Sequence, residues 1–121
     1  MNKISNLNTG KKGETLAIEY LQKEGYEIIA TNWRYKHKEI DIIAQDKNVL
    51  VVVEIKTRKK EKTERVDEIV DSKKQKFLIE ATEAFVENYS NFTEVRFDVI
   101  IIYYQKKIKL IHIKNAYFAG L

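Results

Sequence analysis

The sequence predicts a single α/β domain, and three observations lead to this fold class. Apolar residues recur with helical spacing in two segments, at about 12–23 and 66–89. Runs of β-branched and apolar residues lie between and after these segments, which is typical of buried strands. No Pro/Gly/Ser-rich linker or composition shift divides residues 1–121. The predicted order of elements is therefore α-β-β-β-α-β-β.

Composition limits the classes of protein to which the chain can belong. The 22 basic and 18 acidic residues give a net charge of +4, a modest bias toward polyanions that permits nucleic-acid binding without demonstrating it. The absence of cysteine excludes disulfides and thiolate metal sites. Neither a signal peptide nor a long apolar span is visible, so we expect a cytoplasmic protein with no membrane contact.

The first helix is expected from about residue 12 to residue 23, with Gly25 as the residue that ends it. The polar residues 1–12 are expected to form a flexible tail without fixed structure. Helical spacing places Glu14 on the core-facing row of the helix. This carboxylate either stabilises the positive N-terminal end of the helix or faces inward as part of a site, and its inward position favours the second interpretation.

The first strand is expected at residues 26–35, and basic and aromatic side chains alternate near its end. These are Trp33, Arg34, Tyr35, Lys36, His37 and Lys38. Such a mixture suits stacking on unpaired bases and contacts with phosphates. It equally suits a strand whose rings pack inward while its cations stay in water. The two histidines, His37 and His112, are not spaced as a pair of metal ligands.

The stretch 38–58 has the pattern of a buried hairpin. Residues 49–53 are apolar and β-branched, as in a strand that is covered on both faces. If residues 47–48 form a two-residue loop, the register places Asp41 directly opposite Glu54. A slip of one residue would separate the two carboxylates, so this geometry depends on the register.

Charged side chains meet on one face at the open end of this hairpin. Glu54 and Lys56 share a face because side chains alternate along a strand, and Glu39 and Asp41 share one on the partner strand. Two close carboxylates need a compensating charge, and Mg²⁺ or Mn²⁺ prefers such oxygen ligands. A neighbouring lysine can then orient water or stabilise a pentavalent phosphate. The alternative is a set of cross-strand salt bridges, from Asp41 or Glu39 to Lys56, at a solvated rim.

A charged segment and a long helix are expected to follow the hairpin. Residues 57–65 contain no apolar side chain and are expected to form a mobile loop that either closes over DNA or remains solvated. One helix is expected from about residue 66 or 67 to residue 89. Its core-facing row extends back to Lys74, with Gln75 adjacent. These two residues either lie over the sheet near the carboxylates or are ordinary exposed helix residues.

Two further strands are expected at residues 96–104 and 109–113. In the first of them Asp98 is a lone acid on an otherwise apolar face. We interpret Asp98 as structural, with Arg96, Arg34 or a backbone turn as its partner.

Asp41 followed by Glu54-Ile55-Lys56 resembles the D…(D/E)xK signature of the PD-(D/E)xK nuclease superfamily, which includes restriction endonucleases and archaeal Holliday-junction resolvases. Across most of its length the chain is also similar to the YraN-like family of small endonuclease-like bacterial proteins. One departure is Lys38, because that family usually has glycine there. The blocks that carry the similarity are Gly13-Glu14, Ala17, Tyr20-Leu21, Gly25-Tyr26, Asn32-Trp33-Arg34, 39–44, 53–58, Lys74-Gln75, 96–99 and 115–118.

The resemblance implies a restriction-endonuclease-like three-layer sandwich with a mixed central sheet. It implies a metal-dependent DNA endonuclease, using Mg²⁺ or Mn²⁺, that acts on branched or junction DNA as a homodimer. The metal ligands would be Asp41, Glu54 and the Ile55 carbonyl, with Glu14 as a further acid and Lys56 beside the reacting phosphate. Supporting or DNA-binding residues would be Arg34, Lys36, Glu39, Arg58, Lys74 and Gln75.

The competing hypothesis is a catalytically silent module that keeps the nuclease scaffold and binds DNA or a protein without cutting. Superfamily members that lose activity usually lose a metal ligand or the lysine. Asp41, Glu54 and Lys56 are all present here, which favours the enzyme.

Overall fold

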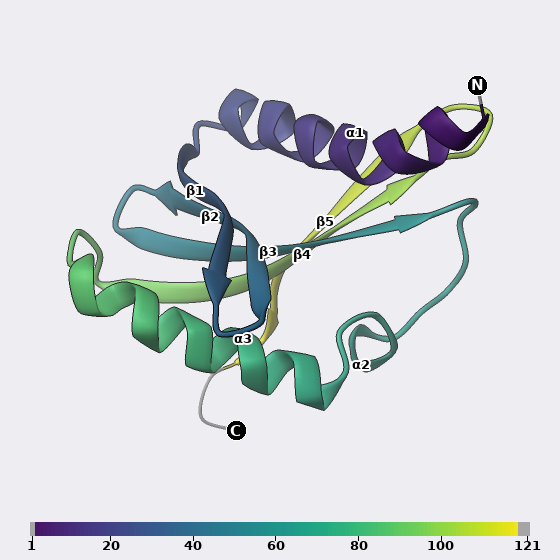
Figure 1. The fold of residues 1–121 in the computed structure, drawn as a ribbon. Coiled ribbons are helices and arrows are strands. Elements are labelled where there is room, and N and C mark those ends of the chain that lie inside the picture. Colours follow the sequence, from purple (N-terminus) through teal and green to yellow (C-terminus); the bar gives the residue numbers. More distant parts are fainter. Residues whose placement is uncertain (1, 119–121) are drawn as a thin grey trace.

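The chain forms three layers, in which one five-stranded sheet lies between two helices (Figure 1). The computed structural model describes residues 2–118, with side chains from Lys11 onward. Helix α1 (Asn2–Lys23) covers one face of the sheet and helix α3 (Ser72–Phe85) covers the other. Among these described residues no helix combines the length and the apolar character that a bilayer crossing requires. The predicted α/β class and order of elements are confirmed.

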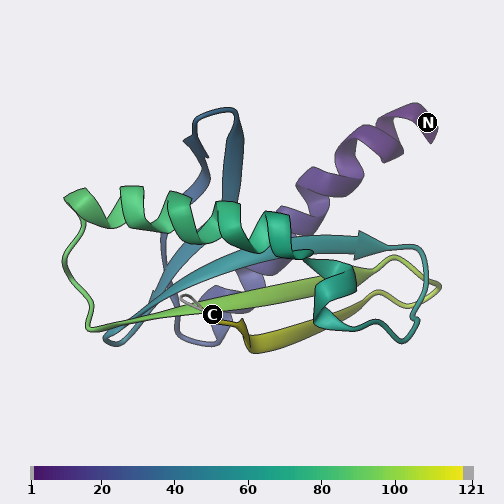
Figure 2. The same ribbon diagram turned by 90° about the horizontal axis from the view of Figure 1, so that it is seen from below.

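The sheet is mixed, and its strands follow one another in space as they do in the chain. Strands β3 and β4 are parallel, whereas the other three neighbouring pairs are antiparallel. A parallel pair needs a crossover, which α3 supplies on the face seen in Figure 2. The strands are β1 (Glu27–Tyr35), β2 (Lys38–Asp46), β3 (Val49–Arg58), β4 (Glu94–Tyr103) and β5 (Lys109–Tyr117).

The β2–β3 hairpin has the predicted two-residue turn. Lys47, the first residue of the turn, adopts a positive φ of 57°, and Asp46 pairs with Val49. The antiparallel register continues as far as the pair Ile42 and Val53. The next position along each strand is Asp41 on β2 and Glu54 on β3, so the turn determines which carboxylates meet.

Two apolar cores hold this hairpin from both sides. Under α1, Leu21 packs with Val51 and Val53. Under α3, Leu78 packs with Val52 and other residues of the sheet. Burying each such side chain stabilises the fold by about 1.5–3 kcal/mol. Strand β3 is therefore held firmly up to Val53, and Glu54 begins its charged end.

The second helix is divided, which the sequence did not predict. A short helix α2 (Val66–Ile69) ends at Val70, whose backbone is extended, and α3 then begins at Ser72. The Asp71 carboxylate accepts a hydrogen bond of 2.8 Å from the Lys74 amide, as a helix N-cap does. Gln75 Nε2 donates to the Val70 carbonyl at 2.8 Å. A 3₁₀ turn, η1 (Val86–Asn88), follows α3.

Two elements are longer than predicted. Helix α1 begins at Asn2 rather than near Lys12, so backbone that was expected to lack fixed structure is helical. Residue 1 of the predicted tail lies outside the described residues. Strand β5 continues beyond Ile113 to Tyr117. This extension brings Tyr117 beside Phe97 of β4, under α3.

Candidate active site

Asp41 and Glu54 lie together where β2 and β3 leave the core. Asp41 Oδ2 accepts a hydrogen bond of 2.8 Å from the Ile55 amide, so the carboxylate is tied to the neighbouring strand. Glu54 is only 3% exposed, although it is charged in water at neutral pH. The hairpin register and the alternation of side chains along β3 explain why both acids reach this point.

Burial and mutual repulsion change how this pair of acids ionises. Burial raises the pKa of Asp41, while the hydrogen bond from Ile55 opposes the rise. Burial and the charge of Asp41 together raise the pKa of Glu54 to about 7. Two adjacent carboxylates titrate as a unit, and the raised pKa of Glu54 means that the pair is partly protonated near neutral pH.

Two lysines from different elements face this pair. Lys56 Nζ lies 3.4 Å from Glu54 Oε2, and Lys74 Nζ lies 3.7 Å from the same oxygen. Lys56 follows Glu54 on β3 by two residues, and Lys74 comes from the first turn of α3. The N-cap that begins α3 at Ser72 therefore also determines where Lys74 points.

The donor set has the chemistry of a hard-cation site with few protein ligands. Glu54 Oε1 is buried and has no hydrogen-bond partner. Among the side chains that the structure describes, from Lys11 to Phe118, no group of three or more His, Cys, Asp or Glu is arranged to hold a metal ion. A Mg²⁺ ion is commonly held by one or two carboxylates, with water and substrate phosphates as its other ligands. Asp41, Glu54 and the Ile55 carbonyl fit that pattern.

Glu14 lies outside the pair, although the resemblance makes it a further acid of the site. Both of its carboxylate oxygens are 3.0 Å from Asn32 Nδ2. Asn32 has a positive φ of 50° and occupies the position of β1 that faces Asp41 in the strand register. The Glu14 carboxylate is therefore bound by Asn32. The sequence reasoning did not assign a role to Asn32; an asparagine inside a strand was the available signal.

A family model described as "Uncharacterised protein family UPF0102" matches residues 13–102. The chain belongs to the UPF0102 family. It is 41% identical over 110 residues to a UPF0102 protein of Flavobacterium psychrophilum, covering 90% of this chain and 92% of that protein. It is 40% identical over 115 residues to a UPF0102 protein of Thermodesulfovibrio yellowstonii, covering 95% and 100%. The YraN-like family predicted from the sequence is confirmed.

The other predicted site residues of this UPF0102 protein make local contacts away from the acid pair. Arg34 lies 3.8 Å from Glu39 across the β1–β2 turn, in an exposed ion pair. Lys36 lies over the ring of the preceding tyrosine. Arg58 is bound at 3.1 Å by an acid of the loop that follows β3. Gln75 supports the junction of α2 and α3, as described above.

The aromatic side chains at the end of β1 pack against the α3 layer. Trp33 and Tyr35 stack with an interplanar angle of 7°, and Trp33 meets Phe85 edge-on at 5.3 Å. Arg34 and Lys36, which alternate with these rings, are exposed. In Figures 1 and 2 the β1–β2 turn accordingly lies beside α3. The rings of this segment therefore pack inward and its cations stay in water, as the second interpretation of the segment predicts.

A second buried acid, Asp98, lies on the α1 side of the sheet. Its carboxylate accepts two bonds of 2.9 Å from Arg96, one of 2.9 Å from the Asn115 amide, and shares one of 2.7 Å with His112. Burial raises the pKa of Asp98, but the bonds from His112 and Arg96 outweigh this effect and hold the pKa below its usual range. The contacts confirm Arg96 as its partner. His112 also contacts the Tyr20 hydroxyl at 2.8 Å.

Proposed function

We propose that this UPF0102 protein is a metal-dependent DNA endonuclease that uses Mg²⁺ or Mn²⁺ to hydrolyse phosphodiester bonds at the Asp41–Glu54 pair. The observation that carries the proposal is a buried carboxylate, Glu54, beside the half-buried Asp41 and facing two lysines, in which one Glu54 oxygen has no hydrogen-bond partner. An acid that serves the fold alone is usually satisfied, as Asp98 is. A pair that is costly to bury and incompletely satisfied favours a functional role.

Asp41, Glu54 and the carbonyl oxygen of Ile55 are the proposed ligands of the cation. When bound, the ion would neutralise charge on the phosphate and lower the pKa of water at the site. Carboxylate ligands must be deprotonated to bind a metal ion, so the cation would take the place of the proton that the pair shares. This exchange would explain why the fold retains two acids here. Glu14 is not included among the ligands, because Asn32 holds its carboxylate.

Lys56 and Lys74 supply positive charge on the other side of Glu54. Their ammonium groups lie close to Glu54 Oε2, so a phosphate brought to this carboxylate would meet both of them. Such fixed charges stabilise the developing charge of a pentavalent phosphate. Lys56 is the residue of the signature that we propose acts on the reacting phosphate, while Lys74 supports it from α3.

The substrate and the assembly are proposed from the resemblance. Among the characterised members of the PD-(D/E)xK superfamily, the resemblance points to the junction resolvases. These enzymes cut branched DNA as homodimers, because two symmetric cuts need two sites. Exposed Arg34 and Lys36 at the β1–β2 turn, beside α3, are suited to phosphate contacts.

The direct test is cleavage of labelled duplex, single-stranded, flap and four-way-junction DNA with Mg²⁺ or Mn²⁺. Lys56→Ala protein prepared in parallel controls for contaminating nuclease. We expect one DNA structure to be cut by the wild type and not by the variant. Equal cutting by both proteins would refute the proposal. Salt-sensitive binding of the same DNAs without cutting would instead favour a silent module.

Metal binding is tested separately by titration with Mn²⁺ at pH 8. We expect Asp41→Asn to weaken Mn²⁺ binding by about tenfold or more, because it removes a charged ligand. Asp46→Asn is the matched control, since Asp46 lies on the same strand at the turn end. A wild-type protein that binds no Mn²⁺, or an Asp41→Asn protein that binds it equally well, would remove the cation from the mechanism.

A further inference from the structure

Five exposed lysines gather on two loops at one end of the sheet. The loop after β3 contributes Lys59, Lys60 and Lys62, and the turn between β4 and β5 contributes Lys106 and Lys107. We call this surface the lysine end. Figures 1 and 2 both show the two loops at the same end of the sheet. Positive charges from segments that are distant in the sequence therefore meet on one surface.

Hydrogen bonds tie the two loops together. The Tyr104 amide donates to the Arg58 carbonyl at 2.7 Å, where β3 ends. Beyond this contact, Gln105 Nε2 donates to Glu61 Oε1 at 3.0 Å, and the Glu61 amide donates to Gln105 Oε1 at 3.1 Å. The backbone that carries the five lysines is therefore held together by contacts from both loops.

The acids of the two loops do not offset these lysines. Glu61 and Glu64 are the only acids in 59–64 and 104–109. Glu61 pairs with Lys109 at 2.9 Å, and Glu64 pairs with Arg58 at 3.1 Å. Each acid thus meets a cation that lies outside the set of five. Like charges that are concentrated in this way attract a polyanion.

The lysine end continues from the acid pair along β3. Lys59 comes three residues after Lys56, which is about 10 Å at the rise of a strand. One strand of DNA carries a phosphate every 3.4 Å or so of axis, so about three phosphates span this distance. Figure 1 shows β2 turning toward α3 while β3 runs on to the lysine end. A DNA backbone at the acid pair can therefore continue along β3 to these lysines.

The residue types of the lysine end suit the backbone of a duplex. Neither 59–65 nor 105–109 contains an aromatic residue, whereas surfaces that bind single strands stack bases on aromatic rings. Lysines contact phosphates without reading the base sequence. Surfaces that enter a membrane carry several large apolar side chains, but the two loops have only Ile108. Double-stranded DNA fits this composition better than a single strand or a membrane.

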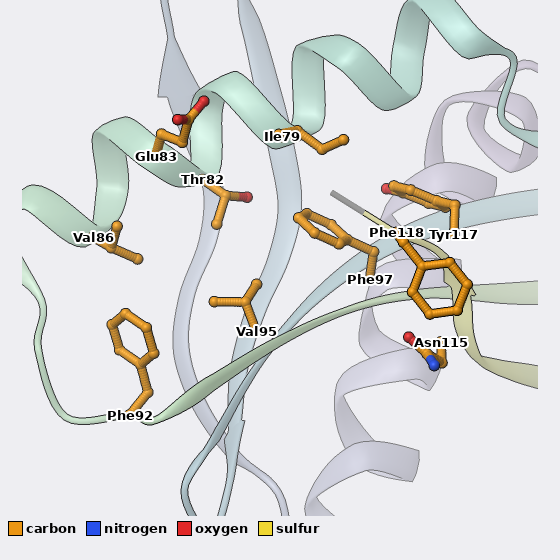
Figure 3. Close-up of a pocket in the computed structure, with 10 residues that line it drawn as sticks. All are labelled: Ile79, Thr82, Glu83, Val86, Phe92, Val95, Phe97, Asn115, Tyr117 and Phe118. Carbon is orange, nitrogen blue, oxygen red and sulfur yellow. The ribbon is translucent and has the colours of Figure 1, made fainter. Parts of the chain in front are cut away.

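A groove on the α3 side of the sheet has the opposite character. Figure 3 shows this groove between α3 and the strands β4 and β5, with Phe92, Val95 and Phe118 along it. Glu83 is the one charged residue among those that line it. An acid among apolar side chains does not attract phosphates, so the groove is not a route for the DNA backbone.

We propose that the lysine end binds the phosphate backbone of a double-stranded DNA arm next to the bond that is cut. This inference rests on the proposed function and names the form of DNA that flanks the site. Each lysine that contacts a phosphate releases counterions from the DNA, so binding depends on salt. Duplexes of different sequence bind alike, because the contacts are to phosphates.

The surface is tested by fluorescence anisotropy of a labelled duplex of about 20 base pairs, in EDTA, over about 50–200 mM KCl. The variants are Lys59→Gln/Lys60→Gln and Lys106→Gln/Lys107→Gln. We expect each to weaken binding by roughly tenfold at the middle of this range. Each should also lower the slope of log affinity against log salt by about 1.8, since each lost contact removes about 0.9.

Lys23→Gln/Lys47→Gln is the matched control. It removes the same charge from the end of α1 and from the β2–β3 turn, at the start of β3 rather than its end. We expect its slope to stay within about 0.5 of the wild type, as phosphate contacts are not lost. Equal weakening by the control and the lysine-end variants, or no weakening by either lysine-end variant, would overturn the proposal.

Two further ligands show which partner the surface takes. A duplex of scrambled sequence should bind the wild type within about twofold, because phosphates are common to both. Tighter binding of a single strand of the same length would overturn the proposal. So would binding to phosphatidylserine vesicles by a wild type that does not bind the duplex.

Binding without metal separates failure of this inference from failure of the proposed function. Duplex binding that the lysine-end variants weaken, by a wild type that cuts no DNA with Mg²⁺ or Mn²⁺, would retain the lysine end and refute the endonuclease. Cutting by the wild type with KM unchanged in both lysine-end variants would retain the endonuclease and refute the lysine end. If both are correct, the variants raise KM more than they lower kcat.

Discussion

The two faces of the sheet each bury acidic side chains, and they treat them in opposite ways. Under α1, Asp98 is fully buried and meets Arg96, His112 and a backbone amide. On the α3 side, Glu54 is almost as deeply buried, but one of its oxygens has no hydrogen-bond partner. It also lies beside a second carboxylate, that of Asp41, which repels its charge. The depth of burial is similar, whereas the supply of donors differs.

As a consequence, the stability that each acid contributes changes with pH in opposite directions. The Asp98 contacts lower its pKa, so they contribute stability above pH 4 that is lost as the pH falls through the folded pKa. Glu54 has a raised pKa, so the stability of its protonated form is present below about 4.5 and is lost as the pH rises through about 7. The first arrangement stabilises the ionised acid, while the second stabilises the protonated acid, and under the proposed function a cation would take the place of that proton.

The largest expected effect is that of Asp98→Ala. The change leaves Arg96 and the Asn115 amide without their acceptor inside the fold, and breaking a buried pair in this way costs about 3–5 kcal/mol. Urea unfolding at pH 7 measures the loss. Glu61→Ala is the control, because Glu61 forms an ion pair of the same length, 2.9 Å to Lys109, at an exposed position. A loss no larger than that of the control would contradict the structural role of Asp98.

Glu54→Gln is expected to act in the other direction in the metal-free protein. The amide cannot ionise, so the variant avoids the cost of charging Glu54 beside Asp41. We expect Glu54→Gln to be more stable than the wild type at pH 8, by up to about 3 kcal/mol, and the difference to shrink toward pH 5. Urea unfolding at both values of pH checks this. A difference that does not change with pH would mean that Glu54 ionises normally in the fold.

A divalent cation should offset most of this advantage. Mn²⁺ at 100 times its dissociation constant is expected to stabilise the wild type by about 2.7 kcal/mol at pH 8, because it binds the folded state alone. Glu54→Gln protein should gain much less, since it lacks one charged ligand. Thermal unfolding with and without Mn²⁺ gives both values. Equal gains would indicate binding elsewhere on the surface.

The sequence was most informative where local rules act over a few residues. A two-residue turn at 47–48 and the alternation of β3 were sufficient to bring Asp41 to Glu54. The structural role of Asp98 followed from a lone acid on an apolar face. Both inferences depend on strand periodicity, which tertiary packing rarely alters once the register is set.

The sequence was less informative where an apolar pattern continues through a break in the backbone. Ile69 and Val70 suit helical spacing, but the cap formed by Asp71 ends that helix and starts another, with Gln75 bonded across the junction. The extension of β5 to Tyr117 was not predicted because it depends on pairing with β4, a strand that is distant in the sequence.

Glu14 gives the smallest expected effect and the sharpest test of where the acid site ends. Helical spacing correctly gave it an inward direction, yet its carboxylate meets Asn32, whose positive φ is not visible in a pattern of apolar residues. Glu14→Gln keeps an oxygen for Asn32, so we expect stability to change by less than about 0.5 kcal/mol. Mn²⁺ affinity should change less than about twofold, in contrast to the loss in Asp41→Asn. A tenfold loss in Glu14→Gln would instead extend the cation site across Asn32 to α1.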